Sequence, residues 1–163
     1  MSLHQLYQLP QQMVSINFYK PSGIIDKLIC LISRGNYCHV NVTVNGVTYE
    51  AKPFIKVRKF VLNKRNKTIR TIDSFKLIKT ELYHFQEIEL VEYLEKQLDK
   101  KYDYLGLLGF IFYINFRSNN SNRLFCSELV FEAFKHIGIL LLDRVKGYKI
   151  SPVILSYSPL FKG

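Results

Sequence analysis

Three side chains of the sequence have the types that nucleophilic catalysis by a thiol requires: Cys126, His39 and Glu50. Cys126 lies in the first turn of a segment with helical periodicity. The unpaired N–H groups at a helix N-terminus favour negative charge, so they would stabilise a thiolate at this position. Such a sulfur could attack a carbonyl carbon if an imidazole took its proton. A buried, inert cysteine is the alternative interpretation.

His39 is the histidine best placed to act as the base. Alternation along its predicted strand puts it on a polar face with Asn41 and Thr43, whereas the opposite face is apolar. A histidine that is simply exposed on that face is the alternative. The other histidines lie in the N-terminal tail, at the end of a predicted strand and at the far end of the Cys126 helix (His4, His84 and His136).

Glu50 is our candidate for the group that orients the imidazole. Asn45-Gly46, a dipeptide that readily supplies two positive φ angles, predicts a β-hairpin with a two-residue turn. That turn places Glu50 opposite Asn41 and one diagonal step from His39. A carboxylate there could fix the tautomer of the ring. An exposed charge on a hairpin is the alternative. The two predicted strands cover residues 38–44 and 47–51.

The other cysteines, Cys30 and Cys38, are expected in the core. Cys38 precedes His39 directly, and neighbours in a strand point to opposite faces, so the two cannot form a catalytic pair. Three cysteines without a C-x-x-C pair argue against a disulfide framework or a zinc site, so at least one free thiol is expected. The thiol chemistry itself needs no metal or organic cofactor.

Strands early in the chain, a helix-rich middle and a strong late helix predict an α+β fold. The chain begins with a strand over Met13–Tyr19 and a helix capped by Ser22 and ending at Ile32. The remaining expected elements are strands near Lys56–Leu62 and Phe75–Phe85, a helix from about Gln86 to Lys100, a helical run to about Phe112, a polar loop over Arg117–Arg123 and a helix over Phe125–Ile137.

Helical periodicity also predicts which side chains face inward. The first helix has an apolar face formed by Ile24, Ile25, Leu28, Ile29 and Ile32. The helix after residue 85 has an apolar stripe of Ile88, Val91, Leu94 and Leu98, and a solvated face of Glu87, Glu92, Glu95 and Lys96.

The length of 163 residues suits a single domain over 1–163, in which we expect residues 1–12 to form a loosely held tail. With 23 basic and 13 acidic residues, the formal charge is 23 − 13 = +10, which favours an anionic partner. We see neither a signal peptide nor a membrane-spanning run, so we expect a cytoplasmic protein by default. A virion-associated protein is the expectation if the source is a phage or a virus.

Two segments leave other functions open. The basic stretch Lys56–Arg70 interleaves cations with apolar residues, as some nucleic-acid surfaces do, although a solvated surface is the usual explanation. The stretches Tyr104–Phe116 and Ile139–Leu142 are unusually apolar. They allow peripheral membrane contact, although most such stretches form core. Exposure of the side chains at 107, 108, 110 and 112 beside Cys126 would favour an acyl-chain substrate.

Short motifs resemble those of the circularly permuted branch of the NlpC-type cysteine peptidases, which is similar to the lecithin:retinol acyltransferase-like enzymes within the papain-like superfamily. The resemblance covers roughly residues 13–159, and Phe-Cys-Ser-Glu-Leu-Val is its most specific part. The matching motifs are Asn-Tyr-Cys-His-Val (36–40), Tyr-Glu-Ala (49–51), Tyr-Asp-Tyr (102–104), Phe-Cys-Ser-Glu-Leu-Val (125–130) and Ser-Pro (151–152). The order His, acid, Cys is the permuted one.

The resemblance implies a papain-like domain whose antiparallel sheet packs against the cysteine-bearing helix. It also implies Cys126 as nucleophile, His39 as base and Glu50 as the third member. Substrate-binding or oxyanion roles are implied for the Tyr-Asp-Tyr motif (Tyr102, Asp103 and Tyr104). Cys38 departs from the family, which often has a small hydroxyl residue there.

The implied activity is cleavage of a peptide or cell-wall amide through a thioester. An acyltransferase or esterase acting on acyl lipids is the second hypothesis, and a non-catalytic binding module for nucleic acid or another polyanion is the third. The sequence does not indicate an oligomeric state.

Overall fold

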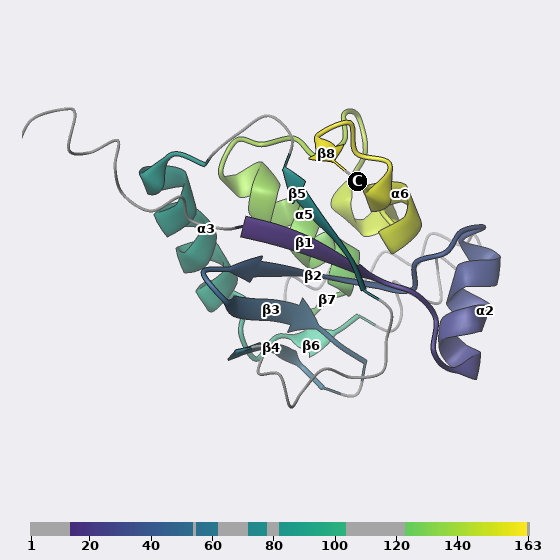
Figure 1. The fold of residues 1–163 in the computed structure, drawn as a ribbon. Helices are drawn as coiled ribbons and strands as arrows, with labels where there is room; N and C mark the ends of the chain where they lie inside the picture. Colours follow the sequence, from purple (N-terminus) through teal and green to yellow (C-terminus); the bar gives the residue numbers. More distant parts are fainter. Residues whose placement is uncertain (1–13, 54, 62–71, 78–81, 104–122, 163) are drawn as a thin grey trace, which may run out of the picture.

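The protein is described from a computed structural model over residues 14–53, 55–61, 72–77, 82–103 and 123–162. These residues form a mixed α+β fold with one six-stranded antiparallel sheet (Figure 1). The sheet strands are β1 (Val14–Tyr19), β2 (His39–Val44), β3 (Val47–Ala51), β4 (Val57–Val61), β5 (Ile72–Leu77) and β8 (Phe161–Lys162). The helices are α2 (Ile24–Ile32), α3 (His84–Lys96), α5 (Cys126–His136), the short 3₁₀ helix η2 (Gly147–Lys149) and α6 (Pro152–Ser156).

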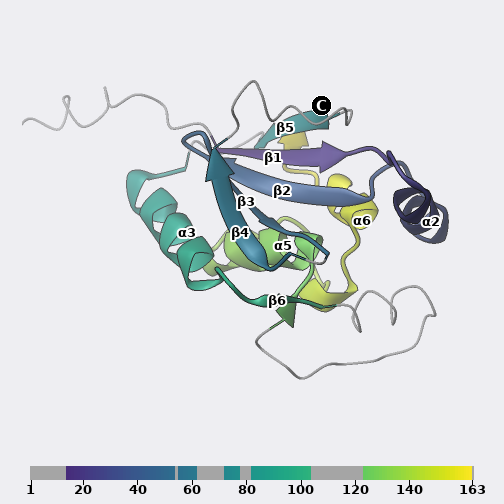
Figure 2. The ribbon, with the colours of Figure 1, turned by 90° about the horizontal axis from the view of Figure 1, so that it is seen from below.

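The strands follow the order β4-β3-β2-β1-β5-β8 across the sheet. A separate parallel pair is formed by β6 (Lys101–Tyr102) and β7 (Arg123–Leu124). In the chain, β7 is followed by α5 after one residue. The sheet covers one side of α5, and α3 and α6 flank that helix (Figure 2). The predicted packing of the sheet against the cysteine-bearing helix is therefore observed, with β2 and β3 as its main sheet neighbours.

The main core lies between the sheet and these helices because β1, β2 and β3 each have one apolar face. Alternate residues of β1 and β2 point into it, and the helices contribute one stripe each. The fully buried side chains of this core include Ile16, Phe18, Val40, Val42, Leu90, Leu94, Leu129, Phe131, Phe134 and Leu155.

The β2–β3 hairpin forms as predicted. Asn45 and Gly46 have φ angles of 50° and 81°, and Val44 pairs with Val47 across the turn. The Asn45 side chain also donates a hydrogen bond to the Glu87 carboxylate, so the turn is fastened to α3. This local geometry fixes which residues of the two strands lie opposite one another.

The prediction for α3 is wrong at its start and in part of its inward face: Leu94 is buried as expected and Val91 and Leu98 pack against the core, but Ile88 and Glu87 were assigned to the wrong sides. Position 84 was expected to end a strand, yet it begins α3, and the Gln86 side chain accepts a hydrogen bond from Tyr83 N–H there. The helix ends at Lys96, before the expected Lys100. Glu87 is buried and Ile88 is 47% exposed, because Leu90 and Leu94 face the core and therefore set the rotation of the helix.

The prediction for α2 is also wrong in part. Its N-cap is Gly23, while the Ser22 hydroxyl donates to Asp26 instead of capping the helix. The apolar face does not enter the core, since Ile24 is 88% and Leu28 is 50% exposed. Figures 1 and 2 both show α2 set apart at the end of the sheet where β1 finishes and β2 begins.

Several other expectations need smaller corrections or cannot be compared. The strand expected over Phe75–Phe85 is β5, which ends at Leu77, and Arg123, expected in a loop, belongs to β7. Phe125 and Ile137, the expected end residues of the next helix, are its N-cap and C-cap, so α5 runs over Cys126–His136. The tail 1–12, the helical run to Phe112 and most of the polar loop at 117–123 lie outside the described residues.

Replacement of Gly46 tests how far the turn stabilises the hairpin. A Cβ at this position meets no atom within 4 Å, so any loss reflects the positive φ alone. Gly46→Ala should lower the free energy of unfolding by about 1 kcal/mol, measured by urea denaturation. Gly46→Asn, whose side chain tolerates this conformation, should cost less than half as much. Equal losses for the two variants would contradict the proposed role of the turn.

Candidate functional site

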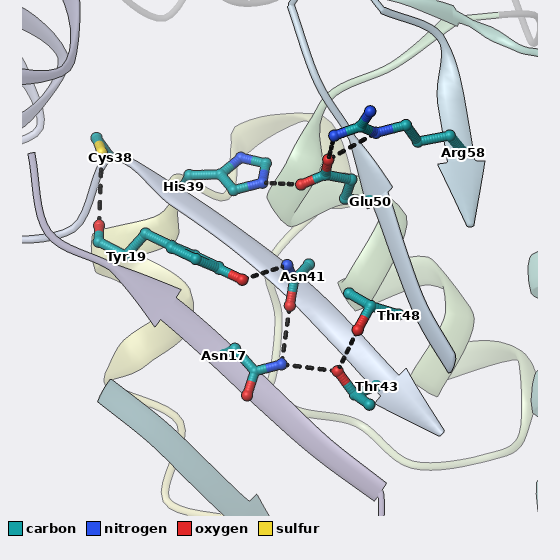
Figure 3. Close-up of polar contacts among 9 residues, drawn as sticks. All are labelled: Asn17, Tyr19, Cys38, His39, Asn41, Thr43, Thr48, Glu50 and Arg58. Carbon is teal, nitrogen blue, oxygen red and sulfur yellow. Dashed lines mark hydrogen bonds and ion pairs between the residues drawn. The ribbon is translucent and has the colours of Figure 1, made fainter. Parts of the chain in front are cut away.

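The His39 ring and the Glu50 carboxylate form a buried hydrogen-bonded pair on neighbouring strands (Figure 3). The distance between His39 Nε2 and Glu50 Oε2 is 3.0 Å, and the two residues are 7% and 5% exposed. The diagonal contact that the hairpin register predicted is therefore present. Because Nε2 faces the carboxylate, Nδ1 is the ring nitrogen left for a second partner.

Cys126 is the candidate for that second partner. It is the first residue of α5, and its interaction with the His39 ring is one of the causes that raise the pKa of His39. The packing of α5 on β2 brings the two positions together from distant parts of the chain. Cys126 is only 4% exposed, so the sulfur is held in a sheltered position.

Arg58 completes the arrangement and was not recognised in the sequence. It lies opposite Glu50 in the register between β3 and β4. Its Nε and one terminal nitrogen donate to Glu50 Oε1 at 2.8 and 2.6 Å, while Oε2 faces His39. Glu50 thus bridges a guanidinium and an imidazole, with one oxygen for each. Arg58 could be found only by knowing that β3 pairs with β4 in this register. The irregular loop that joins the two strands does not predict that register from the sequence.

The charges of these groups stabilise one another. Burial alone would lower the pKa of His39, but hydrogen bonds and charge interactions with Cys126 and Glu50 outweigh it and raise the pKa to about 9. Burial would likewise raise the pKa of Glu50, yet His39 and Arg58 lower it to about 2. Both shifts favour the charged forms, an imidazolium beside a carboxylate.

The residues next to Cys126 fix the start of its helix. Ser127 is fully buried, and its hydroxyl donates to the carbonyl oxygen of Ile150 at 2.5 Å. The Glu128 side chain accepts a hydrogen bond from Phe125 N–H, as residues in the third helical position often do. Burial, with Asp103 and Glu132 nearby, raises the pKa of Glu128 to about 7. Both polar members of the Cys-Ser-Glu motif thus position Cys126 through the backbone.

A chain of polar side chains lies beside His39 on β1, β2 and β3 (Figure 3). Tyr19 pairs with His39 across β1 and β2, and their ring centroids are 5.4 Å apart. The Asn41 amide donates to the Tyr19 hydroxyl at 2.7 Å, and Asn17 donates to both Asn41 and Thr43 at 2.9 Å. The polar face predicted from strand alternation is therefore a connected network, and it holds Tyr19 against the His39 ring.

The Tyr-Asp-Tyr motif is only partly described. Tyr102 ends β6, and the Asp103 N–H donates to the Leu124 carbonyl at 3.2 Å. The motif therefore lies beside β7, the strand that precedes α5. Both residues are buried, and Asp103 lies near Glu128. Tyr104 lies outside the described residues. Their substrate-binding or oxyanion role stays a prediction.

The other cysteines lie apart from the His39–Glu50 pair, as expected. Cys38 is buried, and its thiol donates to the carbonyl of Tyr19 at 3.5 Å and is a hydrogen-bond partner of Cys30. All three cysteines are free thiols, which confirms the prediction of at least one.

The basic segment from residue 56 is engaged with acids of the same chain where the structure describes it. Arg58 binds Glu50, Lys59 Nζ lies 2.8 Å from Glu95, and Lys56 Nζ lies 3.8 Å from Asp99. Residues 62–70 of this segment lie outside the described part of the chain. The described cations thus have intramolecular partners, which favours the structural interpretation over a nucleic-acid surface.

Comparison of the sequence with protein-family models gave no match, and comparison with curated proteins gave none at the threshold used. Within the described ranges, no helix has the length and apolar character needed to cross a membrane. The same residues contain no cluster of three or more His, Cys, Asp or Glu side chains suited to a metal ion.

Removal of the Arg58 guanidinium tests how much its ion pair with Glu50 stabilises the fold. We expect Arg58→Met to lower the free energy of unfolding by about 1–2 kcal/mol at pH 7, a value reduced for the partial exposure of Arg58. The pKa of Glu50 is depressed, so its contribution is present above about 4.5 and is lost as the pH falls through about 2. The difference between wild type and variant should therefore shrink over that interval in urea denaturation.

Lys56→Met is the matched control, because it removes the same charge from an exposed, longer ion pair in the neighbouring segment. We expect a loss below about 0.5 kcal/mol that does not follow the titration of Glu50. An Arg58→Met loss that is as small as this, or that is unchanged between pH 4.5 and pH 2, would contradict the assigned interaction.

Proposed function

We propose that the protein is a thiol-dependent acyl-transfer enzyme that cleaves an amide or ester bond with Cys126 as nucleophile. One observation carries this proposal: the buried ring of His39 has its Nε2 3.0 Å from the Glu50 carboxylate and also interacts with Cys126, which helps to raise its pKa. Nucleophile, base and orienting acid in contact in that order are the arrangement that thiol catalysis requires.

In this proposal His39 holds the proton that Cys126 gives up. A ring with a pKa of about 9 is protonated at neutral pH, which suits a thiolate–imidazolium resting state. The sulfur attacks the carbonyl carbon, an S–C bond forms, and the electron pair of the C=O bond moves to oxygen. When this tetrahedral intermediate collapses, the bond to the amine or alcohol breaks and His39 protonates the leaving group. Water then hydrolyses the thioester with the neutral ring as base.

The start of α5 is the natural place to stabilise the oxyanion. N–H groups in the first turn of a helix lack intrahelical acceptors, and Cys126 itself supplies one of them beside the attacking sulfur. The Ser127 and Glu128 hydrogen bonds hold this turn in place. A preorganised donor avoids reorganisation when negative charge develops on the carbonyl oxygen.

Glu50 and Arg58 act on the ring and do not touch the substrate in this scheme. Glu50 keeps Nε2 protonated, which leaves Nδ1 for exchange with the sulfur, and Arg58 keeps Glu50 ionised and oriented. A peptide or cell-wall amide as substrate, and a papain-like permuted fold, rest on the motif resemblance and stay predictions. The side chains whose exposure would indicate an acyl-chain substrate lie outside the described residues.

Thiol labelling tests the activation of Cys126 within a single molecule. The three cysteines are similarly buried, at 8% exposure for Cys30, 5% for Cys38 and 4% for Cys126. Accessibility alone would therefore make Cys126 the slowest to react. We expect iodoacetamide at pH 7 to modify Cys126 about tenfold or more faster than the other two, measured by peptide mass spectrometry.

His39→Gln should remove this preference while a circular dichroism spectrum verifies that the fold is kept. The other two thiols are internal controls, because their rates should be the same in both proteins. Labelling of Cys126 no faster than Cys30, or an unchanged rate in His39→Gln, would contradict the proposed activation.

A further inference from the structure

The outer face of α2 carries three exposed aliphatic side chains in a single line. Ile24 is 88%, Leu28 is 50% and Leu31 is 75% exposed. Their spacing of four and three residues places them along one face of a helix, which we call the α2 stripe. Aliphatic side chains exposed together in this way mark a surface that contacts something apolar.

The helix is anchored by its other side, so the stripe is not a loosely packed core face. Cys30 is buried at 8% exposure, and Gly35, just after the helix, lies so close to Val153 of α6 that any Cβ there would clash. The strands at either end of α2 fix it further, since β1 ends at Tyr19 and β2 begins at His39. The stripe therefore has a fixed outward direction.

The basic and acidic side chains of α2 lie on different sides of the helix. Lys27 is exposed and borders the stripe, about 60° from Ile24 on the helical wheel. Arg34 is exposed just beyond the C-terminal end of the helix. Asp26, the one acidic residue within α2, lies about 200° from Ile24 and accepts hydrogen bonds from Ser22 at 3.1 and 3.2 Å. Basic groups thus accompany the apolar line, and the acid points away from it.

We propose that the α2 stripe docks the protein on the surface of an anionic phospholipid bilayer. An apolar line bordered by a lysine, with a further arginine just past the end of the helix, fits helices that lie in the membrane interface, where aliphatic side chains enter the acyl boundary and cations contact headgroups. Lysine is depleted at protein interfaces, so Lys27 at the border favours lipid over a protein partner. The formal charge of +10 adds long-range attraction to the same surface.

The docking surface lies next to the candidate site along the chain. Short segments of four and six residues join the two ends of α2 to Tyr19 and His39, which pair across the sheet. Docking through α2 would hold that end of the sheet toward the lipid. The proposal does not depend on catalysis, and a measurement of membrane binding is sufficient to test it.

Vesicle sedimentation with the full-length chain tests the proposal. At 0.1 M salt, we expect at least tenfold stronger partitioning to vesicles of phosphatidylcholine with 30% phosphatidylserine than to phosphatidylcholine alone. Leu28→Glu/Leu31→Glu should reduce binding to the anionic vesicles at least tenfold, because it places two carboxylates on the stripe. Both positions are exposed, so the fold should tolerate the change.

Ile88→Glu/Leu140→Glu is the matched control, because these residues are also exposed, at 47% and 55%, and the change in net charge is the same. It should lose less than threefold in binding. Equal losses in the two double variants would show general electrostatic adsorption of a basic protein and would overturn the proposal. Absence of binding by the wild type, or a dimer in light scattering that only the stripe variant dissociates, would also overturn it.

Discussion

A buried, ionised carboxylate is the constraint on which the candidate site depends. Glu50 is 5% exposed, and a charge in that position is costly unless each oxygen has a strong partner. Arg58 supplies one and His39 the other. The pairing fixes the ring of His39, and the fixed ring in turn determines where a thiol must lie to exchange a proton with it. The sheet and α5 serve to bring these four residues together from four different elements.

This arrangement explains why so much polar surface is buried around His39. The network of Asn17, Asn41, Thr43 and Tyr19 is satisfied largely within itself, so it adds rigidity at small desolvation cost. The Ser127 bond to Ile150 does the same on the side of α5. Both sets of bonds restrict motion of the groups that would react, which is useful in an enzyme that relies on preorganised geometry.

Sequence reasoning succeeded where local chemistry decides the structure. The Asn45-Gly46 turn determines the hairpin register, and register together with alternation placed Glu50 diagonally to His39. Apolar periodicity also located α5 to within one residue at each end. Tertiary packing decided the rest. Leu94 is buried as predicted, but Leu90 is buried with it, which turns Ile88 outward and Glu87 inward. Arg58 was missed because its partner depends on the pairing of two strands joined by an irregular loop, and α2 was assumed to bury a face that the fold leaves outside.

The pKa of His39 reports most directly on the contact between the imidazole, the carboxylate and the sulfur. Titration of the histidine rings by ¹³C–¹H NMR, with His39 assigned by substitution, should give a pKa of about 9 in the wild type. Cys126→Ser, which removes the sulfur with little change of volume, should lower the pKa of His39, and Glu50→Gln should lower it as well. A wild-type value at or below the ordinary 6.5, or a value that neither substitution moves, would contradict the account.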